Sequence, residues 1–217
     1  MSYKAALFDL DGTVLDTLED LTDATNAALA LHGYAPHSIE AVRSFVGNGI
    51  GNLIRRALPE GTNEAEIHTV LGDFKKYYAE HCADKTKPYE GVLEMLRTLR
   101  GAGIKTAVIS NKADFAVKAL AERYFKGLFD IAIGEREGVA RKPAPDSVYE
   151  VMRDLGVTPA DCVYIGDSDV DVLTAKNASM DGIFVTWGFR SEACLREAGA
   201  TELVDAVPVL TERILNK

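Results

Sequence analysis

The sequence predicts an α/β fold in which a doubly wound parallel sheet carries an inserted α-helical cap domain. Short apolar runs alternate with helical patterns, and one long segment holds helical patterns only. The apolar runs cover residues 5–8, 106–109, 131–133, 163–165 and 183–186. Each run ends in polar or glycine residues, as buried strands do. Because parallel strands need crossover connections, this alternation favours a parallel sheet with helices on both faces.

Helical patterns fill the intervals between the predicted strands. Val92, Met95, Leu96 and Leu99 recur at helical spacing, and residues 113–124 and 146–155 are of similar length. A different segment predicts helices without strands, over residues 18–32, 39–45, 50–58 and 64–82. We therefore expect a core domain formed by residues 1–16 and 86–217 and a helical cap formed by residues 17–85.

Composition narrows the class of partner. The chain has 217 residues, 47% of them hydrophobic and 26% charged, which suits one main globular domain with a smaller insert. Its formal net charge of -9 should repel nucleic acids and anionic membranes, so we expect neither as a partner. A small phosphorylated metabolite is the expected partner, and the chain is expected to be a monomer or homodimer. Three cysteines without metal-type spacing favour reduced thiols and a cytoplasmic location.

Polar side chains follow three of the predicted strands directly. They are Asp9, Ser110 and Asp167. Because parallel strands end at a common edge of the sheet, and ligands bind at that edge, these residues should gather there.

Acidic residues cluster in two of these segments. Asp9 and Asp11 point the same way if the chain stays extended, although an acidic turn with a helix cap is the alternative. Asp167 should join them unless it is only a helix cap, whereas Asp169 is interpreted as an anion that favours the first helical turn. Like charges about 4 Å apart repel by ~4 kcal/mol at an effective dielectric near 20, so three acids require a cation. Carboxylate and carbonyl oxygens are hard ligands, so the cation that we expect is Mg²⁺.

Two further segments supply candidate phosphate ligands. Ser110 and Asn111 are expected where a strand gives way to a helix, where they could hold a phosphate oxygen or form an ordinary cap. Lys142 lies in a loop stiffened by prolines, and taken alone it would be a solvated surface lysine.

Four segments in this order resemble the haloacid dehalogenase superfamily. They are DLDGT from Asp9, Ser110-Asn111, Lys142 in KPAPD, and GDSDVD from Gly166. The helical insertion after the first segment resembles the small-cap subgroup that includes phosphoglycolate phosphatases, pyrophosphatases, phosphonatases and β-phosphoglucomutases. The resemblance implies a Rossmann-like core and a magnesium-dependent phosphatase, with 2-phosphoglycolate as the leading substrate.

The resemblance also implies roles for individual residues. Asp9 would attack phosphorus, and Asp11 would act as general acid and then general base. Magnesium would be bound by Asp9, Asp167 and the backbone carbonyl of Asp11, with Asp171 orienting a metal-bound water or Lys142. The transferring phosphoryl oxygens would be bound by Ser110, Asn111 and Lys142.

Several alternatives share these motifs. A mutase of the β-phosphoglucomutase kind has every core motif, and a pyrophosphatase is a further alternative. The presence of Asp11 argues against a dehalogenase, because that branch of the superfamily lacks the second aspartate. A phosphonatase should offer a cap lysine, but Lys75, Lys76 and Lys85 lie in no obvious motif. A non-catalytic binding module should have lost an essential acid or the lysine, and this sequence retains them all.

The cap offers a candidate substrate-reading loop over residues 46–50. It contains Gly47, Asn48 and Gly49, and it resembles the substrate-facing loop of phosphoglycolate phosphatases or is only a tight turn. Three arginines could reach a substrate carboxylate or be solvated, namely Arg43, Arg55 and Arg56.

Overall fold

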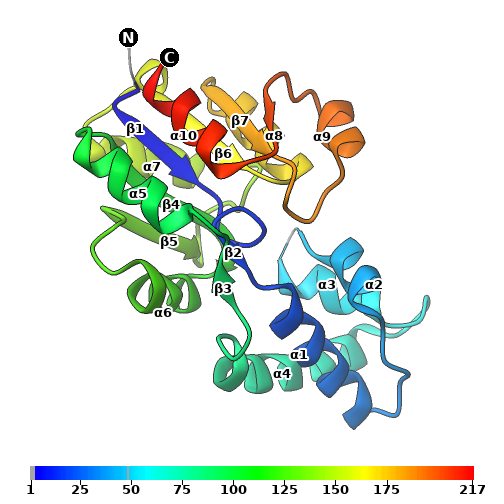
Figure 1. Cartoon of the computed structure of the whole chain (residues 1–217). Coiled ribbons are helices and arrows are strands. Elements are labelled where there is room, and N and C mark those ends of the chain that lie inside the picture. The colour runs from blue at the N-terminus through cyan, green and yellow to red at the C-terminus, as the bar shows by residue number, and fades with distance from the viewer. Residues whose placement is uncertain (1–2, 48) are drawn as a thin grey trace. The chain divides into compact units, whose positions relative to one another are not determined.

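The computed structural model describes residues 3–47 and 49–217. The chain divides into two compact units (Figure 1). One comprises Met1–Leu15 and Pro88–Lys217, and the other comprises Asp16–Lys87. The chain crosses between them in two short strands, β2 (Leu15–Asp16) and β3 (Lys87–Pro88), which pair with each other.

A six-stranded parallel sheet forms the centre of the larger unit, with strand order β5-β4-β1-β6-β7-β8. The strands are β1 (Ala5–Phe8), β4 (Lys105–Ala113), β5 (Ile131–Glu135), β6 (Cys162–Gly166), β7 (Asp181–Val185) and β8 (Leu203–Val204). The chain builds outward from β1 through β4 to β5, then returns to the other side of β1 and builds outward through β6. The direction of winding reverses between β1 and β6, the position at which doubly wound sheets bind ligands.

Helices cover both faces of this sheet, which confirms the predicted α/β class. The side chains of Leu7, Ile109 and Tyr164 pack in one buried cluster with residues of α7 (Asp146–Leu155), α8 (Asp169–Asn177) and α9 (Glu192–Ala198). Phe8 points to the other face, where its ring lies 6.2 Å from that of Phe129. The helices associated with that face are α5 (Val92–Gly101), α6 (Asp114–Phe125) and α10 (Val207–Leu215), of which α5 and α10 are green and red in Figure 1.

The smaller unit is helical and has its own core. Its helices are α1 (Leu18–Leu31), α2 (Ile39–Phe45), α3 (Ile50–Ala57) and α4 (Glu64–His81). Apolar residues at helical spacing meet in a buried cluster that includes Leu29, Ile54 and Phe74. Asp20 accepts hydrogen bonds from the backbone amides of Lys85 and Thr86, so the end of the unit is tied to its first helix.

One strand is longer than the sequence predicts. β4 continues through Ser110, Asn111 and Lys112 to Ala113, and α6 begins only at Asp114. The extension forms because Ala113 pairs with Glu135 of β5 after an irregularity in register. The expectation that Ser110 and Asn111 begin a helix was therefore wrong.

The helices within residues 3–47 and 49–217 are too short or too polar to cross a bilayer.

Candidate active site at the sheet switch point

Asp9 follows β1, one of the two strands at which the winding reverses. Its backbone amide donates a hydrogen bond to the carbonyl of Ile165 in β6, at 2.8 Å. Its Oδ1 accepts a hydrogen bond from the Leu10 amide and lies 2.8 Å from Nζ of Lys142. Burial raises the pKa of Asp9 to about 7, and repulsion from Asp171 adds to the rise against the attraction of Lys142. The side chain thus has a fixed orientation and a low-dielectric setting.

Lys142 is buried, with only 3% of its side chain exposed. Its Nζ lies 2.8 Å from Oδ1 of Asp9 and 2.8 Å from Oδ1 of Asp171, and it donates to the hydroxyl of Tyr164 at 3.0 Å. Burial alone would lower the pKa of Lys142, but the carboxylates of Asp171 and Asp9 outweigh burial and raise it well above its ordinary value. The surface lysine that this segment alone would suggest is therefore a buried ammonium between two acids.

Asp167 follows β6, the second strand at the switch point, and is 1% exposed. Its Oδ1 accepts a hydrogen bond from the Thr13 hydroxyl, and its Oδ2 accepts one from the Phe189 amide at 2.7 Å. Burial raises the pKa of Asp167 well above its ordinary value, and the charges of Asp171 and Asp9 add to this shift. Both donors are neutral, so they leave the carboxylate's charge to be compensated by a cation.

Asp171 lies in the first turn of α8, where it closes a capping box with Ser168. Its Oδ2 accepts hydrogen bonds from the Ser168 hydroxyl at 2.6 Å and from the amides of Ser168 and Asp167. Its Oδ1 faces Lys142. The same carboxylate therefore fixes the start of the helix and the position of the lysine.

Three acids form a cluster whose composition fits a divalent cation. Carboxylate oxygens of Asp9, Asp167 and Asp171 all lie within 4.8 Å of one another. Hard oxygen donors of this kind suit a hard cation, and such a cation would offset the burial and the repulsion that raise the pKa values of Asp9 and Asp167. The cluster includes Asp171, which the sequence assigned to an orienting role, and its bonds to Lys142 and Ser168 fit that role.

Glycines let backbone approach these acids closely. Gly12 has a φ of 84°, and a Cβ there would lie 2.3 Å from Oδ2 of Asp167. A Cβ at Gly188 would lie 2.3 Å from Cβ of Asp167, and one at Gly166 would lie 2.2 Å from Cβ of Asp171. Side chains at these positions would displace the acids.

Asp11 lies in the loop after β1, as Asp9 does, but its carboxylate is not part of the acid cluster. Its Oδ1 and Oδ2 accept hydrogen bonds from Nζ of Lys112, at 2.9 and 3.1 Å. In the neighbouring strand, Ser110 Oγ accepts a hydrogen bond from the Lys112 amide, and the Asn111 side chain donates to the carbonyl of Lys142. The Asn111 bond connects two segments that lie 31 residues apart.

Four contacts of the site were missed by sequence reasoning. Thr13 ends the DLDGT segment and Lys112 directly follows Ser110 and Asn111, so their positions offered a signal. Tyr164 lies inside a predicted strand, and no sequence signal indicates that its hydroxyl lies beside Lys142. Phe189 acts through its backbone amide, which no residue pattern reveals.

Two of the arginines that could reach a substrate are engaged within the helical unit. Arg55 donates to Glu64 at 2.8 Å, and Arg56 donates to the carbonyl of Phe45 at 3.0 Å. Arg43 is exposed on α2, and Asn48 lies outside the described residues.

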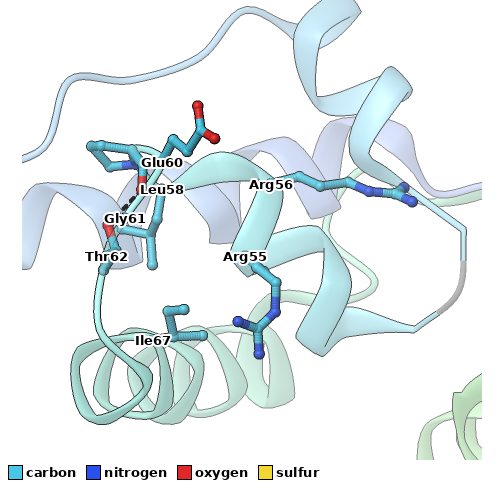
Figure 2. Close-up of a pocket in the computed structure, with 8 residues that line it drawn as sticks. Arg55, Arg56, Leu58, Glu60, Gly61, Thr62 and Ile67 are labelled. Carbon is cyan, nitrogen blue, oxygen red and sulfur yellow. Dashed lines mark hydrogen bonds between the residues drawn. The ribbon is translucent and has the colours of Figure 1, made fainter.

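A pocket of about 510 Å³ lies between α3 and the start of α4 (Figure 2). Its lining includes Arg55, Arg56 and Ile67 but none of the motif residues.

A doubly wound sheet with clustered acids and a buried lysine at its switch point is the arrangement expected of an α/β enzyme. A sequence model of the haloacid dehalogenase-like hydrolases matches residues 6–185. The chain therefore belongs to the haloacid dehalogenase-like hydrolase family, in its phosphatase branch.

Curated relatives and solved structures agree with this assignment. "Phosphoglycolate phosphatase 1" of Pseudomonas aeruginosa is 35% identical over 93% of this chain and 76% of its own. "Phosphoglycolate phosphatase" of Psychrobacter arcticus is 33% identical over 99% of this chain and 97% of its own. A crystal structure of a candidate phosphoglycolate phosphatase from Lactobacillus delbrueckii is 43% identical, with a TM-score of 0.96 and complete coverage of both chains. CbbY from Rhodobacter sphaeroides, solved in complex with phosphate, is 27% identical over 96% of each chain, with a TM-score of 0.74.

Proposed function

We propose that this hydrolase is a magnesium-dependent phosphatase that cleaves a small phosphorylated metabolite through an aspartyl-phosphate on Asp9. The observation that carries the proposal is the buried Nζ of Lys142, which lies 2.8 Å from Asp9 and 2.8 Å from Asp171, two acids that cluster with Asp167. A cationic group held next to a carboxylate nucleophile suits phosphoryl transfer, because that reaction depends on positioning and charge stabilisation.

In the first half of the reaction, a carboxylate oxygen of Asp9 attacks phosphorus as the bond to the leaving oxygen breaks. The leaving oxygen takes a proton from the Asp11 carboxyl. In the second half, a water oxygen attacks phosphorus, the bond to Asp9 breaks, and Asp11 takes the water's proton. The hydroxyl of Ser110, the amide of Asn111 and the ammonium of Lys142 bind the phosphoryl oxygens, and Lys142 also holds Asp9 in place.

Asp9, Asp167 and the backbone carbonyl of Asp11 would hold the magnesium ion, while Asp171 orients Lys142 through the 2.8 Å contact between them. A bound divalent cation supplies charge stabilisation for the phosphoryl group. Asp167 is prepared for this role by burial and by two neutral hydrogen-bond donors that fix both of its oxygens.

We propose 2-phosphoglycolate as the leading substrate and the Asp16–Lys87 unit as a cap that supplies selectivity. Two relatives at 33–35% identity carry the name phosphoglycolate phosphatase, and the phosphate complex of CbbY supports recognition of a phosphoryl group. The helical unit is compact and has its own core, as a separate cap requires.

The test is a screen of phosphorylated metabolites with and without Mg²⁺, scored by released phosphate and by phosphosugar isomer. We expect metal-dependent phosphate release, with 2-phosphoglycolate among the best substrates. Formation of a phosphosugar isomer without release of free phosphate would show that the enzyme is a mutase and not a phosphatase. Asp9→Asn should abolish turnover, whereas Asp169→Asn is the matched control, because Asp169 lies in the same acidic segment as Asp167 but outside the cluster.

A further inference from the structure

A buried lysine touches Asp11 and has no part in the mechanism described above. Lys112 has 4% of its side chain exposed, and Asp11 has 16% exposed. Nζ of Lys112 contacts both oxygens of the Asp11 carboxylate, at 2.9 and 3.1 Å. Contact with both oxygens restricts rotation of the carboxylate as well as its position.

Stability alone gives a poor reason for this pair. Removing two charges from water is costly, and replacing a buried ion pair with apolar side chains is often neutral or stabilising. A lysine buried against Asp11 therefore suggests a role in the reaction.

The backbone of Lys112 is held on two sides. Its amide donates to Oγ of Ser110, at 3.2 Å. Its carbonyl packs against Gly134 of β5, where an added Cβ would lie 2.3 Å from that oxygen. Lys112 lies in the irregular stretch of β4 between the residues that pair with β5, so these two backbone contacts fix the point from which its ammonium extends.

We propose that Lys112 is the positioning residue for Asp11, and that the contact of its Nζ with both carboxylate oxygens holds Asp11 in line with the leaving oxygen. This inference rests on the proposed function. When the bond between phosphorus and the leaving oxygen breaks, the electron pair stays on that oxygen, which takes the proton of Asp11. The carboxylate left behind accepts both hydrogen bonds from Lys112, as in the arrangement observed.

The test compares two substrates that differ in their need for a proton. An alkyl phosphate leaves as a strongly basic alkoxide and needs the acid, whereas p-nitrophenolate leaves without one. The alkyl substrate is 2-phosphoglycolate or the alkyl phosphate that ranks first in the metabolite screen. The quantity is kcat/KM, because it reports the steps up to departure of the leaving group.

Lys112→Met should lower kcat/KM for the alkyl phosphate by about 10- to 100-fold, and that for p-nitrophenyl phosphate by less than about threefold. The loss should appear in kcat, and Lys112→Arg should restore part of it. Lys118→Met is the matched control, because Lys118 is an exposed lysine on α6 and should leave both values unchanged.

An equal loss for both substrates would reduce Lys112 to a structural role, and no loss, or a rise in KM alone, would also overturn the inference. If Lys112→Met does not fold, Lys112→Gln is measured in the same way. Asp9→Asn separates this inference from the proposed function. If Asp9→Asn loses all turnover while Lys112→Met keeps its kcat/KM for both substrates, only the role of Lys112 is refuted.

Discussion

Replacing Lys142 with methionine tests whether the acid cluster depends on an internal cation. The change removes one positive charge that lies 2.8 Å from Asp9 and 2.8 Å from Asp171. At that distance each pair gains about 6 kcal/mol at an effective dielectric near 20, before the cost of burying the ions. After that cost, removing one partner from a buried pair typically lowers stability by about 3–5 kcal/mol.

This loss should be visible in thermal unfolding of the EDTA-treated protein. For a chain of this size, about 3–5 kcal/mol corresponds to a fall in Tm of about 6–20 °C. The control is Lys118→Met, because the pair of Lys118 with Asp114 is exposed and worth about 0–1 kcal/mol. Magnesium-dependent turnover should fall by about 100-fold or more. A fall in Tm no larger than that of the control would show that Lys142 does not compensate these acids.

Three further predictions concern the surroundings of the cluster. Gly188→Ala would place a Cβ 2.3 Å from that of Asp167, so turnover at saturating Mg²⁺ should fall at least about tenfold. The control Gly72→Ala has open space in α4 and should retain turnover. Mg²⁺ at about 100 times its Kd should stabilise the EDTA-treated protein by about 2.7 kcal/mol in thermal unfolding, an effect that Asp167→Asn should remove. Finally, hydrogen bonds from Lys4 and Thr158 lower the pKa of Asp161, so its stabilising effect is fully present above the unfolded-state pKa and is lost progressively as pH falls through the folded-state pKa. Asp161→Asn should therefore lower the urea midpoint more at pH 7 than near pH 3, and equal losses at both would contradict the pairing.

Periodicity was enough to predict the class of the fold. The residues of β1 and β6 form short apolar runs that are buried in full, and helices follow at helical spacing, so the strand and helix pattern is local. The end of β4 was not predictable in this way, because its extension past Ser110 depends on pairing with β5. The residues of β4 alone do not indicate which strand will pair with it.

The arrangement of the acids followed in part from the same local reasoning. Asp9 and Asp167 each follow a strand, and the sheet brings both to the switch point with Asp171. Their assigned roles as nucleophile and metal ligand remain predictions. The burial of Lys142 could not be read from its segment, which alone would suggest a surface lysine. That burial depends on Asp9, Asp171 and Tyr164, which come from three other parts of the chain.

The sequence by itself determined the alternation of strands with helices in the core, the excess of negative charge and the identity of the motif residues. Only the tertiary structure decided which partners those residues have: Lys112 with Asp11, Lys142 between two acids, and the amide of Phe189 on Asp167. The physical reason is that hydrophobic patterning acts over a few residues. Partners separated by 101 or 133 residues, as Lys112 is from Asp11 and Lys142 from Asp9 (142 minus 9), meet only once the order of strands in the sheet is fixed.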